Sequence, residues 1–173
     1  SVEKTKTIQK LAKPEDEFVI KYYSGSKEWK WLSTFNVANP FEYKGYTYPT
    51  VEHAFQSQKI DESHPQADKY HTMCTDKDIT PGKIKKLGGR ENFEKEGYTV
   101  RKDWNETRVK IMKDINKAYY EENPEMVQKL LDTEDKSLEH SGFRIDTFWG
   151  MKKTGGNNHH GKILMDIRKS YQD

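Results

Sequence analysis

The chain has 173 residues, enough for one domain with its own hydrophobic core. Charged residues make up 34% of it, but 30 Lys and Arg against 28 Asp and Glu leave a formal net charge of only +2. A densely charged but balanced surface argues against a protein that coats DNA through a uniformly basic face. Aromatic residues, at 12%, are too frequent for a disordered chain of this polarity.

The sequence carries no sign of export or of membrane insertion. No stretch approaches the ~20 apolar residues that a spanning helix needs, and residues 1–13 lack the apolar run of a signal peptide. Cys74 is the only cysteine, so an internal disulfide is excluded and a reducing compartment is favoured. We expect a cytoplasmic protein with no membrane contact. Residues 1–15 are expected to be a flexible segment, and residues 16–173 one domain.

Two strand-forming stretches precede the first predicted helix. Residues 17–23 alternate between apolar and polar side chains, which predicts a strand. Residues 29–35 show no clean periodicity and predict a loop. Residues 41–48, FEYKGYTY, predict a hairpin, because aromatic side chains on both arms flank a Lys44-Gly45 turn.

The first helix is predicted to begin after Thr50, its N-cap, and to end near Asp61. On such a helix Glu52, Gln56 and Lys59 fall within about 60° of one another and share one stripe. A carboxylate and an ammonium group at the border of an apolar face can be partly desolvated, which shifts their pKa values and makes them chemically useful. An ordinary amphipathic helix with solvated charges has the same spacing, so that interpretation stays open.

The rest of the chain is mostly helical in its pattern. The helix boundaries rest on Thr80-Pro81 and Gly88-Gly89 for one helix, Asp103 for a long helix, and Asn123-Pro124 for a short one. Residues 143–153 predict a strand followed by a loop, and residues 155–161 form a glycine-rich turn before a last helix. The predicted fold class is α+β, a single compact, helix-dominated domain with a few short strands.

A second group of candidate site residues lies near the C-terminus, where Asp146 and Trp149 precede the glycine-rich turn. Such a turn before a helix offers backbone N–H groups to an anion, and Trp149 can stack on a base or a ribose. A turn aspartate and a core tryptophan are the alternative interpretations. The sequence has neither a P-loop nor an H-E-x-x-H motif, and the single cysteine excludes a cysteine-based zinc site. We therefore expect no metal and no cofactor.

Several motifs, in a fixed order, carry a family resemblance. The most specific are TVEHAFQSQK at residues 50–59 and GNNHHGKILMDIR at residues 156–168; YYSGSKEWKWLSTF precedes them, and GR, VRKDW, SLEHS and DTFWG lie between them. From residue 22 to residue 168 the chain resembles the NADAR family of YbiA-like proteins. Two positions depart from the family's pattern: Thr34 stands where Asn is usual, and His160 where Leu is usual.

The resemblance implies a hydrolase that cleaves the N-glycosidic bond of a ribosyl compound. The family offers two substrate classes, an ADP-ribosylated guanine base and a phosphoribosylamino-pyrimidine intermediate of riboflavin synthesis; nucleic acid enters only as a carrier of the first. Two alternatives remain: a module that binds NAD or ADP-ribose without turnover, and a helical interaction domain whose polar stripe is surface. We expect a monomer.

The resemblance also implies a set of site residues. We expect Glu52 to stabilise positive charge at C1 of the ribose and to activate water. Lys59 is expected to protonate the leaving group or to form a Schiff base with the opened sugar, and Asp146 to position a ribose hydroxyl. The expected substrate-binding residues are Ser33, Phe35, Gln56, Arg90, Arg101, Trp104, Trp149, Gly156, Asn158 and Gly161.

Overall fold

The computed structural model describes residues 17–172, so the predicted N-terminal segment, residues 1–15, lies outside the described part. Within it the chain forms seven α-helices, one 3-10 helix and four short strands, which confirms the predicted helix-dominated α+β fold. The elements are β1 (Val19–Tyr22), η2 (Lys30–Leu32), β2 (Phe41–Tyr43), β3 (Tyr46–Tyr48), α2 (Val51–Ser57), α3 (Ala67–Cys74), α4 (Pro81–Leu87), α5 (Arg90–Glu96), α6 (Trp104–Glu121), α7 (Pro124–Asp132), β4 (Ser137–His140) and α8 (His159–Tyr171).

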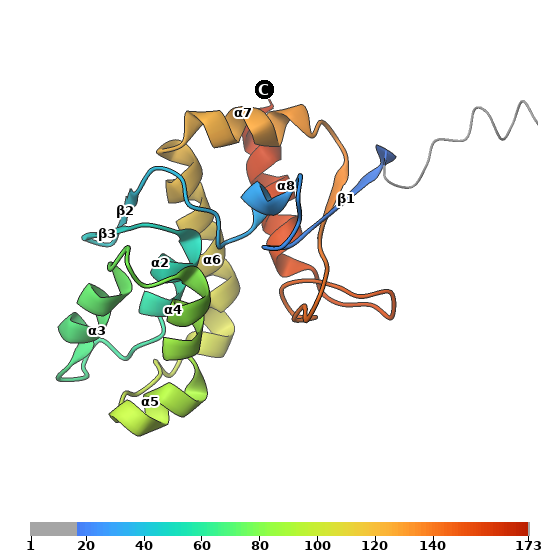
Figure 1. Cartoon of the computed structure of the whole chain (residues 1–173). Coiled ribbons are helices and arrows are strands. Elements are labelled where there is room, and N and C mark those ends of the chain that lie inside the picture. The colour runs from blue at the N-terminus through green and yellow to red at the C-terminus, as the bar shows by residue number, and fades with distance from the viewer. Residues whose placement is uncertain (1–16, 173) are drawn as a thin grey trace, which may run out of the picture.

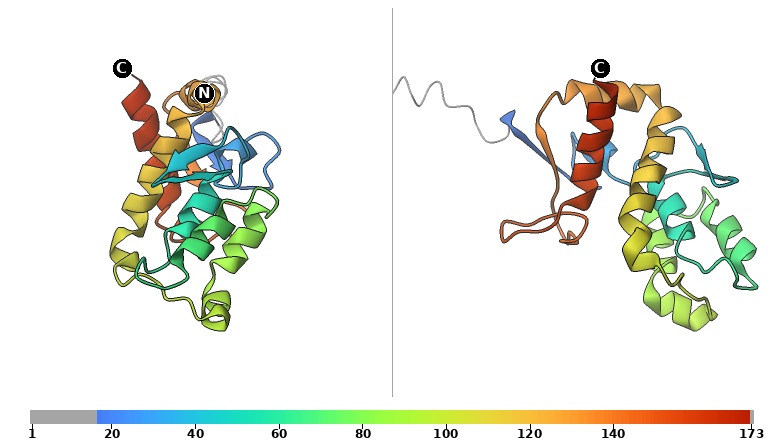
Figure 2. Two further views of the ribbon diagram at one scale, coloured as in Figure 1. Left: turned by 90° about the vertical axis from the view of Figure 1, so that its left-hand side faces the viewer. Right: turned by 180° about the vertical axis from the view of Figure 1, so that it is seen from behind.

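The long helix α6 stands at the centre of the molecule (Figure 1). It packs against α2 and β2, and also against α7 and α8. Helices α3 and α4 pack on α2, so the helices of residues 51–96 lie together on one side of α6. Helix α8 and the β1–β4 pair lie on the other side (Figure 2). None of the helices within residues 17–172 combines the length and the apolar character that crossing a membrane requires.

The strand predicted over residues 17–23 is confirmed as β1. It pairs in parallel with β4, which comes much later in the chain, with Ile20 opposite Leu138. Both side chains are buried, because α8 packs on β4 and covers it. The pair therefore fastens the N-terminal part of the domain to its C-terminal part.

The strand predicted at the start of residues 143–153 is wrong, because the chain turns there. The strand is β4, which ends just before this segment. Gly142 and Arg144 have positive φ angles of +158° and +56°, and Phe143 between them is 75% exposed. A run of strand needs negative φ and at least one covered face, so the segment forms turns instead.

The predicted hairpin is confirmed. Strands β2 and β3 pair antiparallel with Phe41 opposite Tyr48. The turn residues Lys44 and Gly45 have φ angles of +49° and +87°, as the tight two-residue turn between twisted strands requires. Phe41 and Tyr48 are both buried, so this hairpin closes one end of the core.

Helix α2 begins as predicted but ends earlier. The Thr50 side chain accepts a hydrogen bond from the backbone N–H three residues on and so caps the helix, as predicted. The helix ends at Ser57 rather than near Asp61, because the chain leaves it to pair with a later segment: the Arg101 N–H donates to the Lys59 carbonyl at 2.8 Å. Lys59 thus lies in a turn beyond α2, and the helical stripe predicted for it is wrong.

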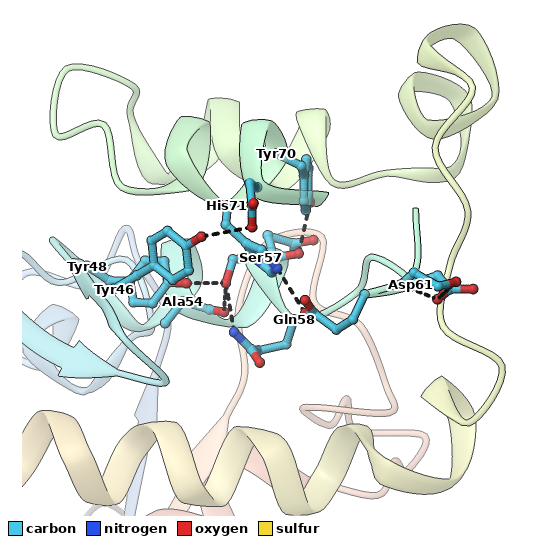
Figure 3. A network of polar contacts seen from close by, with 12 residues as sticks. Tyr46, Tyr48, Ala54, Ser57, Gln58, Asp61, Tyr70 and His71 are labelled. Carbon is cyan, nitrogen blue, oxygen red and sulfur yellow. Dashed lines mark hydrogen bonds and ion pairs between the residues drawn. The ribbon is translucent and has the colours of Figure 1, made fainter. Parts of the chain in front are cut away.

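A buried polar network fixes the end of α2 (Figure 3). Ser57 Oγ shares a hydrogen bond of 2.7 Å with the Tyr48 hydroxyl and accepts one of 2.9 Å from Gln58 Nε2. The Tyr70 hydroxyl donates to the Gln56 carbonyl at 2.8 Å. These bonds tie α2 to the hairpin and to α3, so the turn that follows α2 starts from a fixed point.

The predicted starts of the later helices hold, with one difference at Asp103, and one earlier segment also differs from its prediction. Thr80 caps α4, and α7 begins with the proline that follows Asn123, both as predicted. Asp103 precedes α6 as predicted, but its side chain does not cap the helix and instead accepts two hydrogen bonds from the Arg101 guanidinium. The segment 29–35, predicted as a loop, contains the short 3-10 helix η2.

Candidate active site

A cavity of about 440 Å³ lies between α2, α6 and the segment that follows β4. Its volume is typical of a small-molecule site. Helix α2 contributes Glu52, Phe55 and Gln56, and α6 contributes Trp104 and Arg108. The loop after β1, the segment after β4 and the start of α8 close the remaining sides.

Glu52 lies in the first turn of α2 and is only 5% exposed. Each of its carboxyl oxygens has a donor: Gln56 Nε2 donates to Oε1 at 2.7 Å, and Thr34 Oγ1 donates to Oε2 at 2.8 Å. The first donor lies one turn along the same helix, and the second comes from the loop before the hairpin. The two bonds hold the carboxyl group in one orientation at the cavity wall.

Lys59 lines the same cavity and is partly buried. Its Nζ donates to the Gly88 carbonyl at 2.9 Å and lies 6.0 Å from the centroid of the Trp104 ring. Burial lowers the pKa of Lys59 below its usual range; the Glu52 carboxylate opposes this shift, and the cations of Lys85 and Arg108 add to it. A larger share of neutral amine is therefore available than an exposed lysine would offer.

Gly88 follows α4 next to Gln56 and Lys59, and a side chain there would displace the Gln56 side chain. A Cβ on Gly88 would lie 2.1 Å from Gln56 Oε1 and 2.9 Å from Gln56 Cδ. Gln56 in turn holds Glu52, while the Gly88 carbonyl holds Lys59. The glycine predicted only as a helix end is thus in contact with the residues around both candidate catalytic groups.

The opposite wall of the cavity carries two histidines next to a buried tyrosine. His160 Nδ1 and the Tyr22 hydroxyl share a hydrogen bond of 2.6 Å, and the rings of His140 and His160 are 5.8 Å apart. Burial lowers the pKa of His160 to about 3, with a further contribution from His140. Burial also lowers the pKa of His140 below its usual range. Both histidines are therefore neutral near pH 7 and add no charge to the cavity.

Aromatic rings form the rest of the inner surface. Phe55 contacts Trp104 and Trp149, with ring centroids 5.0 Å and 5.3 Å apart. Both tryptophans line the cavity. Stacking surface of this kind suits a ribose or a base.

Most of the predicted site residues lie at this cavity. The ones that line it are Ser33, Phe35, Glu52, Gln56, Lys59, Trp104, Asp146 and Trp149. The Asp146 side chain also accepts a hydrogen bond of 2.6 Å from the Phe148 N–H, as a turn aspartate does. The structure thus brings together residues from three distant parts of the sequence.

The two arginines predicted to contact substrate do not line this cavity. Arg90 has a side chain that is 92% exposed and pairs with Glu94 one turn along α5. Arg101 pairs with Asp103 and lines a second cavity, of about 670 Å³, next to the hairpin. Each has a carboxylate partner of its own.

The three residues of the C-terminal glycine-rich turn that were predicted to bind substrate, Gly156, Asn158 and Gly161, contact neighbouring backbone instead. The Asn158 side chain accepts from the His140 N–H at 3.0 Å and donates to the Leu138 carbonyl at 2.9 Å, so it joins α8 to β4. A Cβ on Gly161 would lie 2.1 Å from the same carbonyl. Gly156 has a φ angle of +155° and packs against the chain near residue 150. None of the three lines the cavity of about 440 Å³.

The structure also adds cavity residues that the sequence did not single out for this role. Among them are Arg108, Lys85, Arg144 and His140. Thr34 and His160, the two departures from the family pattern, also line the cavity. The VRKDW motif ends four residues before Arg108, but no local pattern marks that arginine. Within residues 17–172, no group of three or more His, Cys, Asp or Glu side chains is placed to hold a metal ion.

Comparison with known proteins agrees with this architecture. The NADAR domain family matches residues 20–172. N-glycosidase YbiA of Escherichia coli (strain K12) is 28% identical over 164 residues, which cover 93% of each chain. The chloroplastic riboflavin biosynthesis protein PYRR of Zea mays is also 28% identical; the match covers 97% of this chain but 27% of that protein.

A solved structure gives the same result for the fold. The NMR structure of the E. coli protein YbiA superposes with a TM-score of 0.71 and 29% sequence identity, covering 89% of this chain and 84% of that one. Together with the family match over most of the sequence, this similarity shows that the chain belongs to the NADAR domain family.

Proposed function

We propose that the protein is a hydrolase that cleaves the N-glycosidic bond of a ribosyl compound, with Glu52 and Lys59 as its catalytic groups. One observation carries the proposal: a buried, doubly hydrogen-bonded carboxyl group and a partly buried amine line one cavity of small-molecule size. Burying an ionisable group costs free energy of folding, and such groups are concentrated at functional sites.

Glu52 supplies the charge that the reaction needs. As the C1–N bond breaks, positive charge develops on the ribose at C1, and a carboxylate held beside that carbon stabilises the transition state. The same carboxylate accepts a proton as a water oxygen bonds to C1. Because Thr34 and Gln56 already orient it, no reorganisation is required during the reaction.

Lys59 acts on the leaving side. As an ammonium group it donates a proton to the departing nitrogen, which leaves as a neutral base. As a neutral amine, favoured by its lowered pKa, it instead attacks C1 of the opened sugar, and the base leaves with a proton as its C1–N bond breaks and a lysine Schiff base forms. Water then hydrolyses the Schiff base, which releases the sugar and restores the amine. Our proposal gives Asp146, an exposed residue of the cavity lining, the role of holding a ribose hydroxyl.

The relatives support a ribosyl substrate. The E. coli relative is named an N-glycosidase, and the maize relative is named for riboflavin biosynthesis. We propose two substrate classes for this chain, a phosphoribosylamino-pyrimidine and a guanine base carrying ADP-ribose, the second either free or on a nucleic acid. The tryptophan-lined inner surface provides stacking area for either one.

A substrate panel tests the proposal. The purified protein is incubated with a phosphoribosylamino-pyrimidine, with ADP-ribosylated guanosine and with NAD, and the products are identified by mass. We expect at least one of three outcomes: the aminopyrimidine with ribose 5-phosphate, guanosine with ADP-ribose, or nicotinamide with ADP-ribose. Binding of ADP-ribose by calorimetry with no turnover of any compound would instead identify a non-catalytic binding module.

A further inference from the structure

The cavity described above has an excess of positive charge. Among the residues that the structure describes, four cationic and two acidic side chains line it, namely Lys59, Lys85, Arg108 and Arg144 against Glu52 and Asp146. The two cavity histidines are neutral near pH 7 and do not change this balance. A concave site with an excess of one sign of charge favours ligands of the opposite sign.

Arg108 is the cation whose position is best defined. It lies in the second turn of α6, and its guanidinium carbon is 3.6 Å from the centroid of the Phe148 ring. Phe148 is packed in turn against Trp149 and His159, with ring centroids 4.9 Å and 4.5 Å apart. The guanidinium is therefore held flat against a supported ring at the cavity wall.

The Arg108 side chain has no acidic partner within residues 17–172. Its Nε is buried without a hydrogen-bond partner, and no carboxylate forms an ion pair with it. Arg90 and Arg101, by contrast, each pair with a carboxylate. A partly buried guanidinium with free donors leaves hydrogen-bonding capacity that an anionic ligand can use.

We propose that Arg108, assisted by Lys85 of the same cavity lining, binds a phosphate group of the substrate and thereby selects phosphorylated ribosyl compounds over neutral nucleosides. The inference rests on the proposed function, because it assigns a subsite within the same cavity. Arginine suits this role, since its planar fork can donate two parallel hydrogen bonds to phosphate oxygens while its face stacks on an aromatic ring. Lys85 is exposed, has no carboxylate partner among the described residues and adds a second positive charge to the lining.

The test measures binding of compounds that lack a base on C1 of the ribose that would react, so none of them can be turned over by the proposed reaction. Isothermal titration compares ribose 5-phosphate, ADP-ribose, inorganic phosphate and ribose on the wild-type chain, Arg108→Gln and Lys110→Gln. Lys110 is the matched control, because it lies two residues further along α6 with a side chain that is 80% exposed and loses the same charge. Circular dichroism and the melting temperature check that each variant is folded.

We expect ribose 5-phosphate to bind more tightly than ribose. Arg108→Gln should weaken ribose 5-phosphate roughly 10- to 100-fold and leave ribose unchanged, whereas Lys110→Gln should match the wild type. Arg108→Lys should restore part of the loss. If ADP-ribose is affected and ribose 5-phosphate is not, the subsite holds the diphosphate rather than a 5-phosphate. The proposal is overturned if a folded Arg108→Gln protein binds both phosphorylated ligands like the wild type.

The outcome of the binding experiment does not depend on whether the protein catalyses the proposed hydrolysis. Phosphate binding through Arg108 without hydrolysis of any N-ribosyl compound would retain the subsite and remove the hydrolase proposal. Conversely, hydrolysis of neutral nucleosides as fast as of their phosphorylated forms would retain the reaction and overturn the subsite.

Discussion

The two walls of the cavity differ in kind. The wall built from α2, the turn after it and α6 carries ionisable groups, among them Glu52, Lys59 and Arg108. The wall built from the end of β4 and the start of α8 carries His140 and His160, both kept neutral by burial. The charges that could act on a substrate therefore come mainly from the helical side of the molecule, which Figure 1 shows to the left of the β1–β4 pair.

The difference shows that one domain can keep its reactive groups on one wall of a cavity and its stabilising contacts on the other. The neutral wall is fastened by long-range contacts, such as the hydrogen bond between Tyr22 and His160 and the parallel β1–β4 pair. These contacts fix the position of the neutral wall relative to the charged one. The neutral histidines add no charge that would offset Glu52, Lys59 or Arg108, so these three groups keep their full interaction with a bound substrate.

The largest effect is expected for the amine. Lys59→Met should lower kcat about 100- to 10 000-fold, the range for loss of a positioned acid or base. If the amine attacks the sugar, borohydride should trap a wild-type adduct on Lys59 that intact-protein mass spectrometry detects. A folded Lys59→Met protein with undiminished kcat would remove the amine from the mechanism; Lys117→Met, at an exposed position on α6, is the control.

Gly88→Ala tests how tightly the charged wall is packed. The new methyl group would lie 2.1 Å from Gln56 Oε1, so Gln56 must move and Glu52 loses one of its donors. We expect a loss of about 1–3 kcal/mol in the free energy of unfolding, measured by urea denaturation, together with lower kcat. Gly82→Ala, inside α4 and with ordinary contact distances, should leave kcat unchanged and should not lower the free energy of unfolding.

The neutral wall should give the protein an acid-sensitive stability. The unfolded chain protonates its histidines near pH 6.5, whereas His160 in the folded state takes up its proton only near pH 3 and His140 is shifted in the same direction. The free energy of unfolding should therefore be highest above pH 6.5 and fall as the pH drops toward 3. Each of these histidines contributes up to about 1.4 kcal/mol per pH unit.

Urea denaturation at several pH values measures that slope. His160→Gln should flatten it, whatever its effect on stability at pH 7. An unaltered slope in His160→Gln would show that His160 is not kept neutral in the folded protein.

The smallest effect is expected at the second donor to Glu52. Thr34→Val removes the hydroxyl that donates to Oε2 at 2.8 Å and keeps the shape of the side chain. We expect kcat/KM to fall about fivefold, equivalent to about 1 kcal/mol, mainly through kcat. Thr34→Ser keeps a hydroxyl and should recover most of the activity; equal kcat in Thr34→Val and the wild type would contradict a positioning role.

Local sequence patterns predicted the local features well. The hairpin, the Thr50 cap and the pairing of Glu52 with Gln56 on one helix face all follow from spacing over a few residues. The position of Lys59 did not, because the pairing of its carbonyl with the Arg101 N–H ends α2 early. A contact between segments that are far apart in the sequence thus decided how the amine reaches the cavity.

The residues missed at the cavity have the same explanation. Arg108 is one of many Lys and Arg residues in the sequence, and only its stacking on Phe148, forty positions later, sets it apart. Arg90 and Arg101, predicted to bind substrate, cannot be told apart from it by charge; the structure shows that each has a carboxylate partner, which Arg108 lacks among the described residues. Charge alone is visible in a sequence, but the pairing of charges is not.

The central claim is that Glu52 stabilises a ribosyl transition state, and Glu52→Gln tests it most directly. Glutamine keeps the size of the side chain and removes its charge. Measured on the best compound of the panel, kcat should fall about 100- to 1000-fold, or about 2.7–4 kcal/mol, while the melting temperature and the binding of ribose 5-phosphate stay close to wild type. A folded Glu52→Gln protein that turns over at the wild-type rate would contradict the account.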